Sequence, residues 1–198
     1  EMQLQSPEMN VYGVSLPGAP GIIIGFNDSI SWGFTNNYRD VKDFYEIETI
    51  DKDFYRFDGK PRSFDKRAEV IKIKGKPDYI DTVLYTIHGP VSYDTSFPDP
   101  LRTGKMFAMQ WMAHRGTNEL LAIQLLNKAQ DYISFTEAIL HFQCPAQNIV
   151  YADRAGNIAM WGQGQFINKW KDQGRYVMKG NASATLWGQD IPMTENPH

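Results

Sequence analysis

The chain has 198 residues, of which 42% are hydrophobic and 13% aromatic, and its formal net charge is −3 at pH 7. This length is enough for one substantial hydrophobic core, and the small charge gives no electrostatic basis for binding nucleic acid or a membrane surface. No apolar run approaches the ~20 residues that a membrane-spanning helix needs. The single cysteine, Cys144, cannot form an internal disulfide, and beside Pro145 we expect a small buried side chain there and not a nucleophile.

Residues 13–46 hold the densest group of turns and polar side chains. Two prolines and two glycines in residues 16–21 predict a sharp corner, because proline fixes φ and glycine permits positive φ. The β-branched run 22–24 predicts a short strand buried on both faces that ends at Gly25. Alternating apolar and small residues at 30–35 predict a second strand.

Asn36 and Asn37 follow this second strand directly. Asparagine tolerates left-handed backbone, and such a corner can leave a main-chain N–H directed at open space. An oxyanion hole needs a donor of this kind. A hairpin corner without any chemistry explains the same residues, and the spacing alone favours that reading.

Two carboxylates, Asp40 and Asp43, come next, with the carbonyl of Lys42 between them. A short loop that presents several oxygen atoms could hold a hard cation such as calcium. The same spacing is common on solvated loops, so by itself it is weak evidence for a metal site.

The middle of the chain predicts further strands. Residues 44–48 and 54–57 are expected to form a hairpin, and basic and apolar residues alternate through 62–74, which favours a strand with one wet face over an anion-binding patch. A strand over 79–87 then bends at His88. This histidine is a candidate general base, but beside Gly-Pro the stronger expectation is a turn residue with one backbone hydrogen bond.

The second half of the chain predicts a loop over 95–104, a buried strand over 107–112 and two helices. The first helix begins at residues 116–118 and the second covers 131–142, and both are expected to lie across a sheet. The apolar positions expected to face inward are Leu120, Leu121, Ile123 and Leu125 on the first helix, and Ile133, Phe135, Ile139 and Leu140 on the second. Residues 148–152 and 158–162 predict a hairpin.

Known chemical signatures are few. The sequence has no zinc-ligand spacing, P-loop, dinucleotide-binding glycine fingerprint or Gly-x-Ser-x-Gly elbow, so no organic cofactor is expected.

Several motifs in collinear order nevertheless resemble the β-subunit of penicillin acylases, which are N-terminal-nucleophile hydrolases. These motifs are Pro17-Gly18-Ala19-Pro20-Gly21, Gly25-Phe26-Asn27, Ile30-Ser31-Trp32-Gly33-Phe34-Thr35-Asn36, Asp40-x-x-Asp43-x-Tyr45, Thr86-Ile87-His88-Gly89-Pro90-Val91, Asn148-Ile149-Val150-Tyr151-Ala152-Asp153, Gly156-Asn157-Ile158 and Ile191-Pro192-Met193.

This resemblance implies an α+β fold, with a mainly antiparallel β-sheet and two helices on one face, as part of an αββα sandwich. It implies a single domain over 1–198 that is a fragment of the β-subunit. The activity that it implies is hydrolysis of the acyl side-chain amide of penicillins or of related acyl amides, with acyl-homoserine lactones as a close variant.

Site residues follow from the resemblance position by position. Asn36 matches the residue whose backbone N–H completes the oxyanion hole. Asp40, Lys42 and Asp43 match calcium ligands, with Gly174 as a rough match for a further carbonyl ligand. The positions that match the acyl pocket are Ile24, Phe34, Trp111 and Gln147. In penicillin G acylases a small serine stands at the position of Phe34 and an apolar residue at that of Gln147, so a phenylacetyl substrate is not assured.

The resemblance also sets expectations about the rest of the protein. The family's nucleophile is an N-terminal serine whose α-amino group acts as base, whereas this chain starts at Glu1. We therefore expect a fragment that is inactive alone, holds calcium weakly, and has the remainder of the acylase α- and β-chains and a small acyl amide as partners. The expected location is the periplasm or exterior of a bacterium.

A stand-alone β-rich module that binds glycans through its aromatic side chains is the alternative. Exposed and buried aromatic residues look alike in a sequence, so nothing in the chain contradicts this reading. The fold discriminates between the two hypotheses. A sheet with two helices on one face favours the acylase, and a sandwich without helices favours the glycan-binding module.

Overall fold

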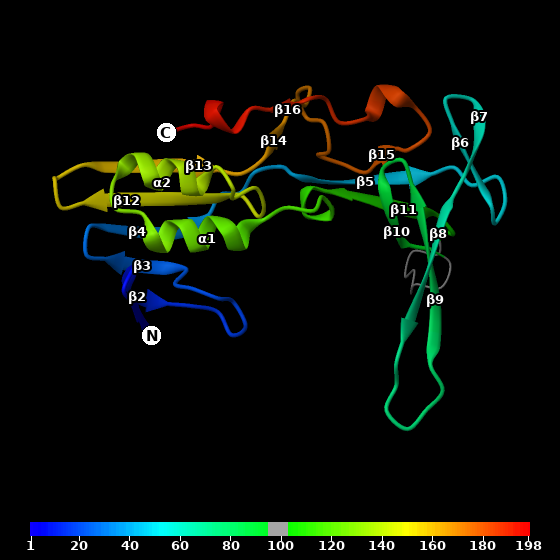
Figure 1. The fold of residues 1–198 in the computed structure, drawn as a ribbon. Helices are drawn as coiled ribbons and strands as arrows, with labels where there is room; N and C mark the ends of the chain where they lie inside the picture. Colours follow the sequence, from blue (N-terminus) through cyan, green and yellow to red (C-terminus); the bar gives the residue numbers. More distant parts are fainter. Residues whose placement is uncertain (95–102) are drawn as a thin grey trace. The chain divides into compact units, whose positions relative to one another are not determined.

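The computed structural model describes residues 1–94 and 103–198, which form two compact units built from separate stretches of chain (Figure 1). Unit 1 comprises residues 1–39, 115–168 and 189–198, and unit 2 comprises residues 40–114 and 169–188. The single domain expected over 1–198 stays a prediction beside this division.

Unit 1 contains a six-stranded antiparallel sheet with the strand order β1-β2-β3-β4-β12-β13. The strands are β1 (Met2–Ser6), β2 (Met9–Val14), β3 (Ile24–Asn27), β4 (Ile30–Asn36), β12 (Gln147–Asp153) and β13 (Ile158–Gln163). A two-stranded sheet adds β14 (Phe166–Ile167) and β16 (Asp190–Ile191), and a short 3-10 turn, η3, covers Met193–Glu195.

Two helices pack side by side against this sheet, α1 (Glu119–Lys128) and α2 (Tyr132–Ile139) (Figure 1). Asn118 caps α1 by accepting from the Leu121 N–H, and Asp131 forms a capping box with Ser134 at the start of α2. The buried cluster that joins helices and sheet contains Val11, Ile22, Ile30, Trp32, Leu126, Ala129, Phe135, Ala138, Ile139, Ile149, Tyr151 and Trp161. The expected sheet with two helices on one face is therefore present, and a helix-free sandwich is excluded.

The inward faces of the two helices differ in part from the sequence-based expectation. Leu120 and Ile133 are exposed, at 55% and 69%, so their assignment to the core was wrong, and Leu125 is also on the surface. The buried face of α1 is shifted to Ala122, Ile123, Leu126 and Asn127. Asn127 is therefore part of the buried face of α1, where the hydrophobic pattern predicted leucine side chains.

Asn127 is buried because it completes the backbone hydrogen bonds of Ile22. Its Oδ1 accepts from the Ile22 N–H at 2.7 Å, and its Nδ2 donates to the Ile22 carbonyl at 2.7 Å. Ile22 is fully buried but precedes β3, whereas Ile24 is 38% exposed. The prediction of a strand over 22–24, buried on both faces, is therefore wrong. The strand begins at Ile24, and the backbone of Ile22 forms hydrogen bonds with the Asn127 side chain instead.

The hairpin of β12 and β13 is confirmed, and its turn is fixed by one carboxylate. Asp153 accepts from the backbone N–H of Asn157 at 2.9 Å and from its side-chain amide at 2.8 Å. These hydrogen bonds hold the pKa of Asp153 below its usual range. Gly156 takes a φ of 92° in this turn, a region that glycine enters without strain.

A buried amide network joins the last segment of unit 1 to its core. Gln163 is fully buried and donates to the carbonyls of Ile139 and Phe142. Its Oε1 accepts from Asn196 Nδ2 at 3.1 Å, and the same Nδ2 contacts the Gly164 carbonyl at 2.9 Å. Residues 189–198 are thus bound by specific polar contacts and not by apolar packing alone.

Cys144 is buried, as expected, and its backbone N–H donates to the Glu119 carboxylate at 3.0 Å. Burial raises the pKa of the Cys144 thiol, and the charge of Glu119 raises it further. We expect iodoacetamide to alkylate the folded protein at Cys144 at least about tenfold more slowly than the urea-unfolded protein, because the thiolate is the reactive form. Mass spectrometry of the Cys144 peptide measures both rates, and equal rates would contradict a buried thiol.

Unit 2 contains a second six-stranded sheet with the order β15-β5-β11-β10-β9-β8, in which only the short β15 runs parallel to its neighbour. Its strands are β5 (Lys42–Ile47), β8 (Asp65–Ile71), β9 (Tyr79–Thr86), β10 (Gly89–Tyr93), β11 (Met106–Trp111) and β15 (Met178–Lys179). A separate hairpin pairs β6 (Phe54–Phe57) with β7 (Lys60–Ser63), and two 3-10 turns are η1 (Met112–His114) and η2 (Ser183–Thr185). Tyr45, Ile47, Tyr55, Phe64 and Ala108 form its core.

The strands of unit 2 agree with the sequence-based predictions only in part. The strand β6 pairs with β7, so the predicted hairpin of 44–48 with 54–57 is reduced to one isolated bridge between Thr49 and Tyr55. The strand β11 confirms the expected strand over 107–112. Most of the loop expected over 95–104, residues 95–102, lies outside the described residues.

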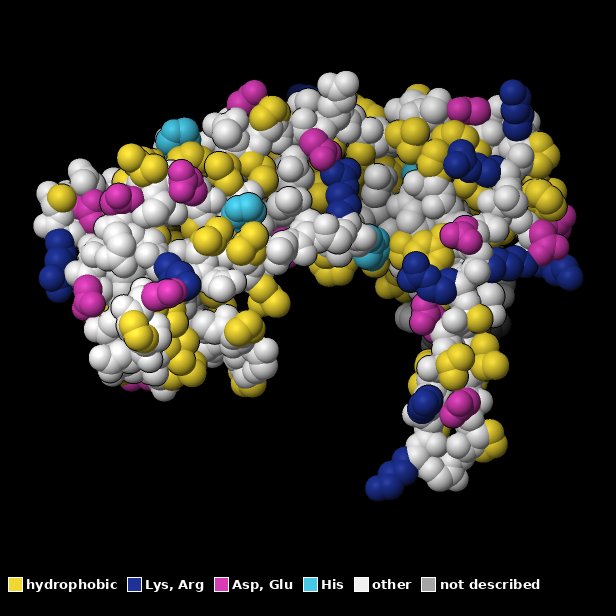
Figure 2. Space-filling view, viewed as in Figure 1, with side chains coloured by type: hydrophobic (Ala, Val, Ile, Leu, Met, Phe, Trp, Pro, Cys, Tyr) yellow, Lys and Arg dark blue, Asp and Glu magenta, His cyan; other side chains and the backbone are white. Residues whose placement is uncertain are grey.

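The β8–β9 hairpin differs most from its expected form. Every residue of β8 is exposed, so the strand has two wet faces and not one. Apolar side chains lie on its surface between charged ones (Figure 2), among them Val70, Ile71, Tyr79 and Ile80, which are 49–62% exposed. The alternation is present in the sequence, but no described residue covers the apolar side. None of the described helices is long and apolar enough to cross a lipid bilayer.

Candidate functional site

Asn36 is the last residue of β4 and lies opposite Gln147, the first residue of β12. The next residue, Asn37, donates its backbone N–H to the Ala146 carbonyl at 3.2 Å. Because hydrogen-bonded and non-hydrogen-bonded pairs alternate along an antiparallel ladder, the backbone N–H of Asn36 points away from β12.

On the other side of β4, the pairing with β3 covers only Gly25 with Trp32 and Phe26 with Ser31. The described ladder with β3 therefore ends well before Asn36. This end of β4 combines an exposed position with an amide that β12 does not use, which is the geometry that the sequence-based hypothesis requires.

Two of the expected pocket residues are neighbours of Asn36. The Gln147 side-chain Nε2 lies 3.4 Å from Asn36 Oδ1. Phe34 lies two residues earlier on the same face of β4, is half-buried, and packs its ring against Phe142 with the ring centroids 5.4 Å apart. Ile24 opens β3 in the same unit with its side chain partly exposed.

Trp111 belongs to unit 2, at the end of β11. Its ring is 37% exposed, meets the ring of His114 edge to face, and lies 5.5 Å from Lys42 Nζ. Substrate contact through Ile24, Phe34, Trp111 and Gln147 stays a prediction.

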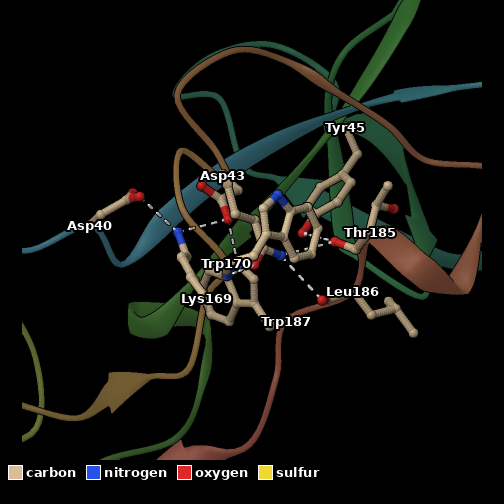
Figure 3. A network of polar contacts seen from close by, with 9 residues as sticks. Asp40, Asp43, Tyr45, Lys169, Trp170, Thr185, Leu186 and Trp187 are labelled. Carbon is tan, nitrogen blue, oxygen red and sulfur yellow. Dashed lines mark hydrogen bonds and ion pairs between the residues drawn. The ribbon is translucent and has the colours of Figure 1, made fainter.

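Asp40 and Asp43 converge on one cation, the ammonium of Lys169 (Figure 3). Lys169 Nζ lies 3.1 Å from Asp40 Oδ2 and 2.8 Å from Asp43 Oδ2. Lys169 Nζ forms no hydrogen bond with a described residue, so both contacts are ion pairs. The side chain of Asp43 is fully buried and that of Lys169 is 11% exposed, whereas that of Asp40 is 56% exposed.

The surroundings of Asp43 are asymmetric. Its Oδ2 also accepts a short hydrogen bond from Trp187 Nε1, and the Trp187 ring lies 5.3 Å from the Lys169 ammonium (Figure 3). Its Oδ1 is buried without a hydrogen-bond partner among the described residues. Gly174 closes this side, because a Cβ at that position would lie 2.7 Å from Asp43 Cγ. The backbone can approach the carboxylate this closely only because residue 174 is a glycine.

The segment that carries Lys169 and Trp187 is held by a buried glutamine. Gln173 donates to the carbonyls of Thr185 and Leu186 and accepts from the backbone N–H of Trp170. The Tyr45 hydroxyl donates to the same Thr185 carbonyl at 3.1 Å. Burial, followed by the charges of Asp43 and Asp40, raises the pKa of Tyr45, so its phenol stays neutral.

The resemblance implies a calcium ion at Asp40, Lys42 and Asp43. Calcium takes about six to eight oxygen ligands at roughly 2.3–2.6 Å. The Met112 N–H donates to the Val41 carbonyl, so by the alternation of the ladder the carbonyl of Lys42 points away from β11, as a ligand would require. However, the Lys169 ammonium contacts both carboxylates. Among residues 1–94 and 103–198, no three His, Cys, Asp or Glu side chains gather into a metal-binding group.

The residues therefore do not fit a calcium ion while Lys169 keeps this position. The carboxylate and carbonyl oxygen atoms are present, but the ammonium of Lys169 lies beside both carboxylates, where the calcium ion would have to bind. Calcium ligation by Asp40, Lys42 and Asp43 stays a prediction, and the structure gives these residues a different cation.

His88 is a structural residue, as the turn reading predicted. It is 2% exposed, its ring stacks on Tyr45 with the centroids 3.9 Å apart, and its Nε2 lies 3.0 Å from the Gly180 carbonyl. Burial lowers the pKa of His88, so the ring is neutral near pH 7 and Nε2 carries the proton that this carbonyl accepts. A ring enclosed in the core of unit 2 is not placed to exchange protons with a substrate.

Sequence reasoning did not identify Lys169 or Trp187. Both are far from Asp40 and Asp43 in the chain, and each is an ordinary residue type without a motif. The only signal was the rough match at Gly174, which lies on the same segment and contacts the same carboxylate.

Comparisons with known proteins bear on the family and the fold of the chain. A family model described as penicillin amidase matches residues 1–198. The sequence is 27% identical over 209 residues to the acyl-homoserine lactone acylase QuiP of Pseudomonas aeruginosa, covering 96% of this chain and 24% of that protein. It is 24% identical over 200 residues to the penicillin G acylase of Escherichia coli, covering 94% of this chain and 23% of that protein. The chain thus spans about a quarter of the length of these relatives.

Among solved structures, the fold is similar to that of a thermostable penicillin G acylase from Alcaligenes faecalis. The TM-score is 0.84 with 26% sequence identity, and the match covers 99% of this chain and 35% of that chain. This chain has mostly antiparallel sheets with two helices and matches that fold at a high TM-score, so the predicted fold class is confirmed. Because the family model matches every residue of the sequence, the chain belongs to the penicillin amidase family.

Proposed function

We propose that the complete gene product containing this chain is an amide hydrolase that cleaves acyl amides, and that the backbone N–H of Asn36 is one donor of its oxyanion hole. The observation that carries the second part is the direction of this amide. Asn37 and not Asn36 donates to Ala146, so the Asn36 N–H is left on the side of β4 away from β12. Membership of the penicillin amidase family supports the first part.

In this proposal the attacking group is an N-terminal serine, which the resemblance assigns to polypeptide outside residues 1–198. Its Oγ forms a bond to the carbonyl carbon, its proton passes to the α-amino group and on to the leaving amine, and the C–N bond breaks. Water then hydrolyses the acyl-enzyme. The part assigned to this chain is to stabilise the negative oxygen of each tetrahedral intermediate through the Asn36 N–H.

The substrate class is an acyl amide, because the relatives are named as acylases of acyl-homoserine lactones and of penicillin G. Phe34 and Gln147 stand next to Asn36, where penicillin G acylases are expected to carry a small serine and an apolar residue. A substrate panel therefore needs both an acyl-homoserine lactone and a chromogenic phenylacetyl anilide.

Replacing Asn36 by proline tests the oxyanion role, because proline removes the backbone N–H together with the side chain and fixes φ. β12 does not use this N–H, and Thr35 already has the extended backbone that precedes a proline. We expect kcat/KM for acyl amide hydrolysis by the complete protein to fall about 100-fold to 1000-fold, the usual cost of one lost oxyanion donor.

Asn36→Ala is the matched control, because it removes the side chain and keeps the N–H. We expect it to retain kcat within about threefold of the unmodified protein, a change of less than 1 kcal/mol in the barrier. Circular dichroism and the melting temperature report whether each variant is folded. A folded Asn36→Pro enzyme with full activity, or an equal loss in both variants, would refute the assignment of this amide.

Two further parts of the proposal rest on the resemblance alone. We propose that the remainder of the acylase α- and β-chains packs with this chain and that the protein resides in the periplasm or outside a bacterial cell. Fractionation of the source cells, followed by immunodetection of this chain and its co-purifying polypeptides, tests both. Recovery in the cytoplasmic fraction would contradict the location.

A further inference from the structure

The pair of acidic residues in unit 2 has its own cation. We propose that Lys169 does at this site what a bound metal ion would do: its ammonium holds Asp40 and Asp43 together, so that the site needs no divalent cation. As a corollary, removal of the ammonium leaves a site that calcium can enter. The proposal is independent of the catalytic role suggested for Asn36.

Asp43 is buried in unit 2 and needs a positive charge beside it. The Asp43 side chain is fully buried, and a buried carboxylate is costly unless a positive charge and hydrogen-bond donors meet it. Lys169 Nζ at 2.8 Å and Trp187 Nε1 both contact its Oδ2. These two groups come from the segment 169–188, so the carboxylate and its partners are brought together only when unit 2 has folded.

The ammonium of Lys169 occupies the position between the two carboxylates. Lys169 Nζ lies within 3.1 Å of one oxygen from each aspartate, as a bridging ion would. It forms no hydrogen bond with a described residue, so its attraction to the two carboxylates is that of an ion pair. A divalent ion bound to the same two oxygens would lie within a few ångströms of this ammonium and be repelled by it. Lysine and calcium therefore exclude each other here.

One oxygen of Asp43 stays without a contact to Lys169 or Trp187. Asp43 Oδ1 is buried and has no hydrogen-bond partner among the described residues, and Gly174 lies against it. The carbonyl of Lys42 points away from β11. With the ammonium gone, the two carboxylates and this carbonyl form an oxygen-rich, negatively charged site, which is the chemistry that calcium prefers.

Hydrogen exchange in the complete protein tests the proposal locally, because peptides that cover residues 40–47 and 169–188 report only on this site. The probe is CaCl2 at millimolar concentration, compared with EDTA. For the unmodified protein we expect the same exchange rates in both. For Lys169→Met, which is unbranched, one atom shorter and uncharged, we expect exchange about 100-fold faster in EDTA and largely restored protection in CaCl2.

Lys171→Met is the control, because Lys171 is an exposed lysine two residues away and its removal should leave both peptides unchanged. If Lys169→Met does not fold, Lys169→Arg takes its place and should remain insensitive to calcium, because it keeps the charge. Protection of the unmodified protein by CaCl2 would overturn the metal-free site. A folded Lys169→Met variant that ignores calcium would overturn the corollary. Neither result depends on enzymatic activity.

Discussion

Replacing Asn127 by leucine is expected to lower the free energy of unfolding of unit 1 by about 2–6 kcal/mol, although leucine is the better helix former and nearly equal in size. Asn127 is 2% exposed, and its amide binds both the N–H and the carbonyl of Ile22 at 2.7 Å. Leucine would leave both backbone groups buried without partners, and each such group costs about 1–3 kcal/mol.

Native-state hydrogen exchange of α1 and β3 peptides measures this loss within unit 1. Gln124→Leu is the matched control, because it makes the same kind of change on the exposed side of α1 and should shift stability by less than about 0.5 kcal/mol. If the two variants were equally stable, the hydrogen bonds from Asn127 to Ile22 would contribute nothing, contrary to their distances and burial.

Replacing Gly25 by alanine is expected to disrupt the β2–β3 pair, with a loss of at least about 3 kcal/mol. Gly25 lies opposite Gly13 in the register of these strands. A Cβ at position 25 would lie 3.0 Å from Gly13 Cα and 2.7 Å from the Ile22 Cγ2 atom, and it would overlap the Tyr12 carbonyl oxygen. Two of these neighbours are backbone atoms, which cannot move aside without breaking the ladder.

Gly116→Ala provides the comparison, since a Cβ there meets nothing within 4 Å and the change should be neutral or slightly stabilising. Exchange of β2 and β3 peptides, together with the yield of folded protein, distinguishes the two variants. Unchanged protection of β2 in Gly25→Ala would mean that the sheet can widen at this glycine pair.

Local patterns predicted most of the fold. The hairpin of β12 and β13 followed from its turn, Asp153-Arg154-Ala155-Gly156-Asn157, and α2 followed from an N-terminal Asp131 and an apolar repeat. The helix faces were less predictable, because which side of α1 is buried depends on the polar bond from Asn127 to Ile22, over 100 residues away in the chain. Hydrophobic periodicity contains no information on such a bond.

The candidate site, like the fold, was predicted only in part from the sequence. Asn36, Asp40 and Asp43 lie on one short stretch with recognisable motifs, so the sequence identified them together. Lys169 reaches the two aspartates only through the tertiary fold, and a single lysine on an irregular segment carries no local signal. The calcium hypothesis was based on oxygen atoms that are close to each other in the sequence. The competing charge of Lys169 could not be predicted in this way, because it comes from a distant segment.

The interleaved course of the chain has a consequence for the order of assembly on the ribosome. Within residues 1–198, unit 2 receives its last segment with residues 169–188, and unit 1 receives residues 189–198 after that. During synthesis, the Oε1 atom of Gln163 therefore lacks its hydrogen bond from Asn196 until the latter residue has left the ribosome. Within this stretch, the unit whose synthesis begins first also receives its segment nearest the C-terminus last.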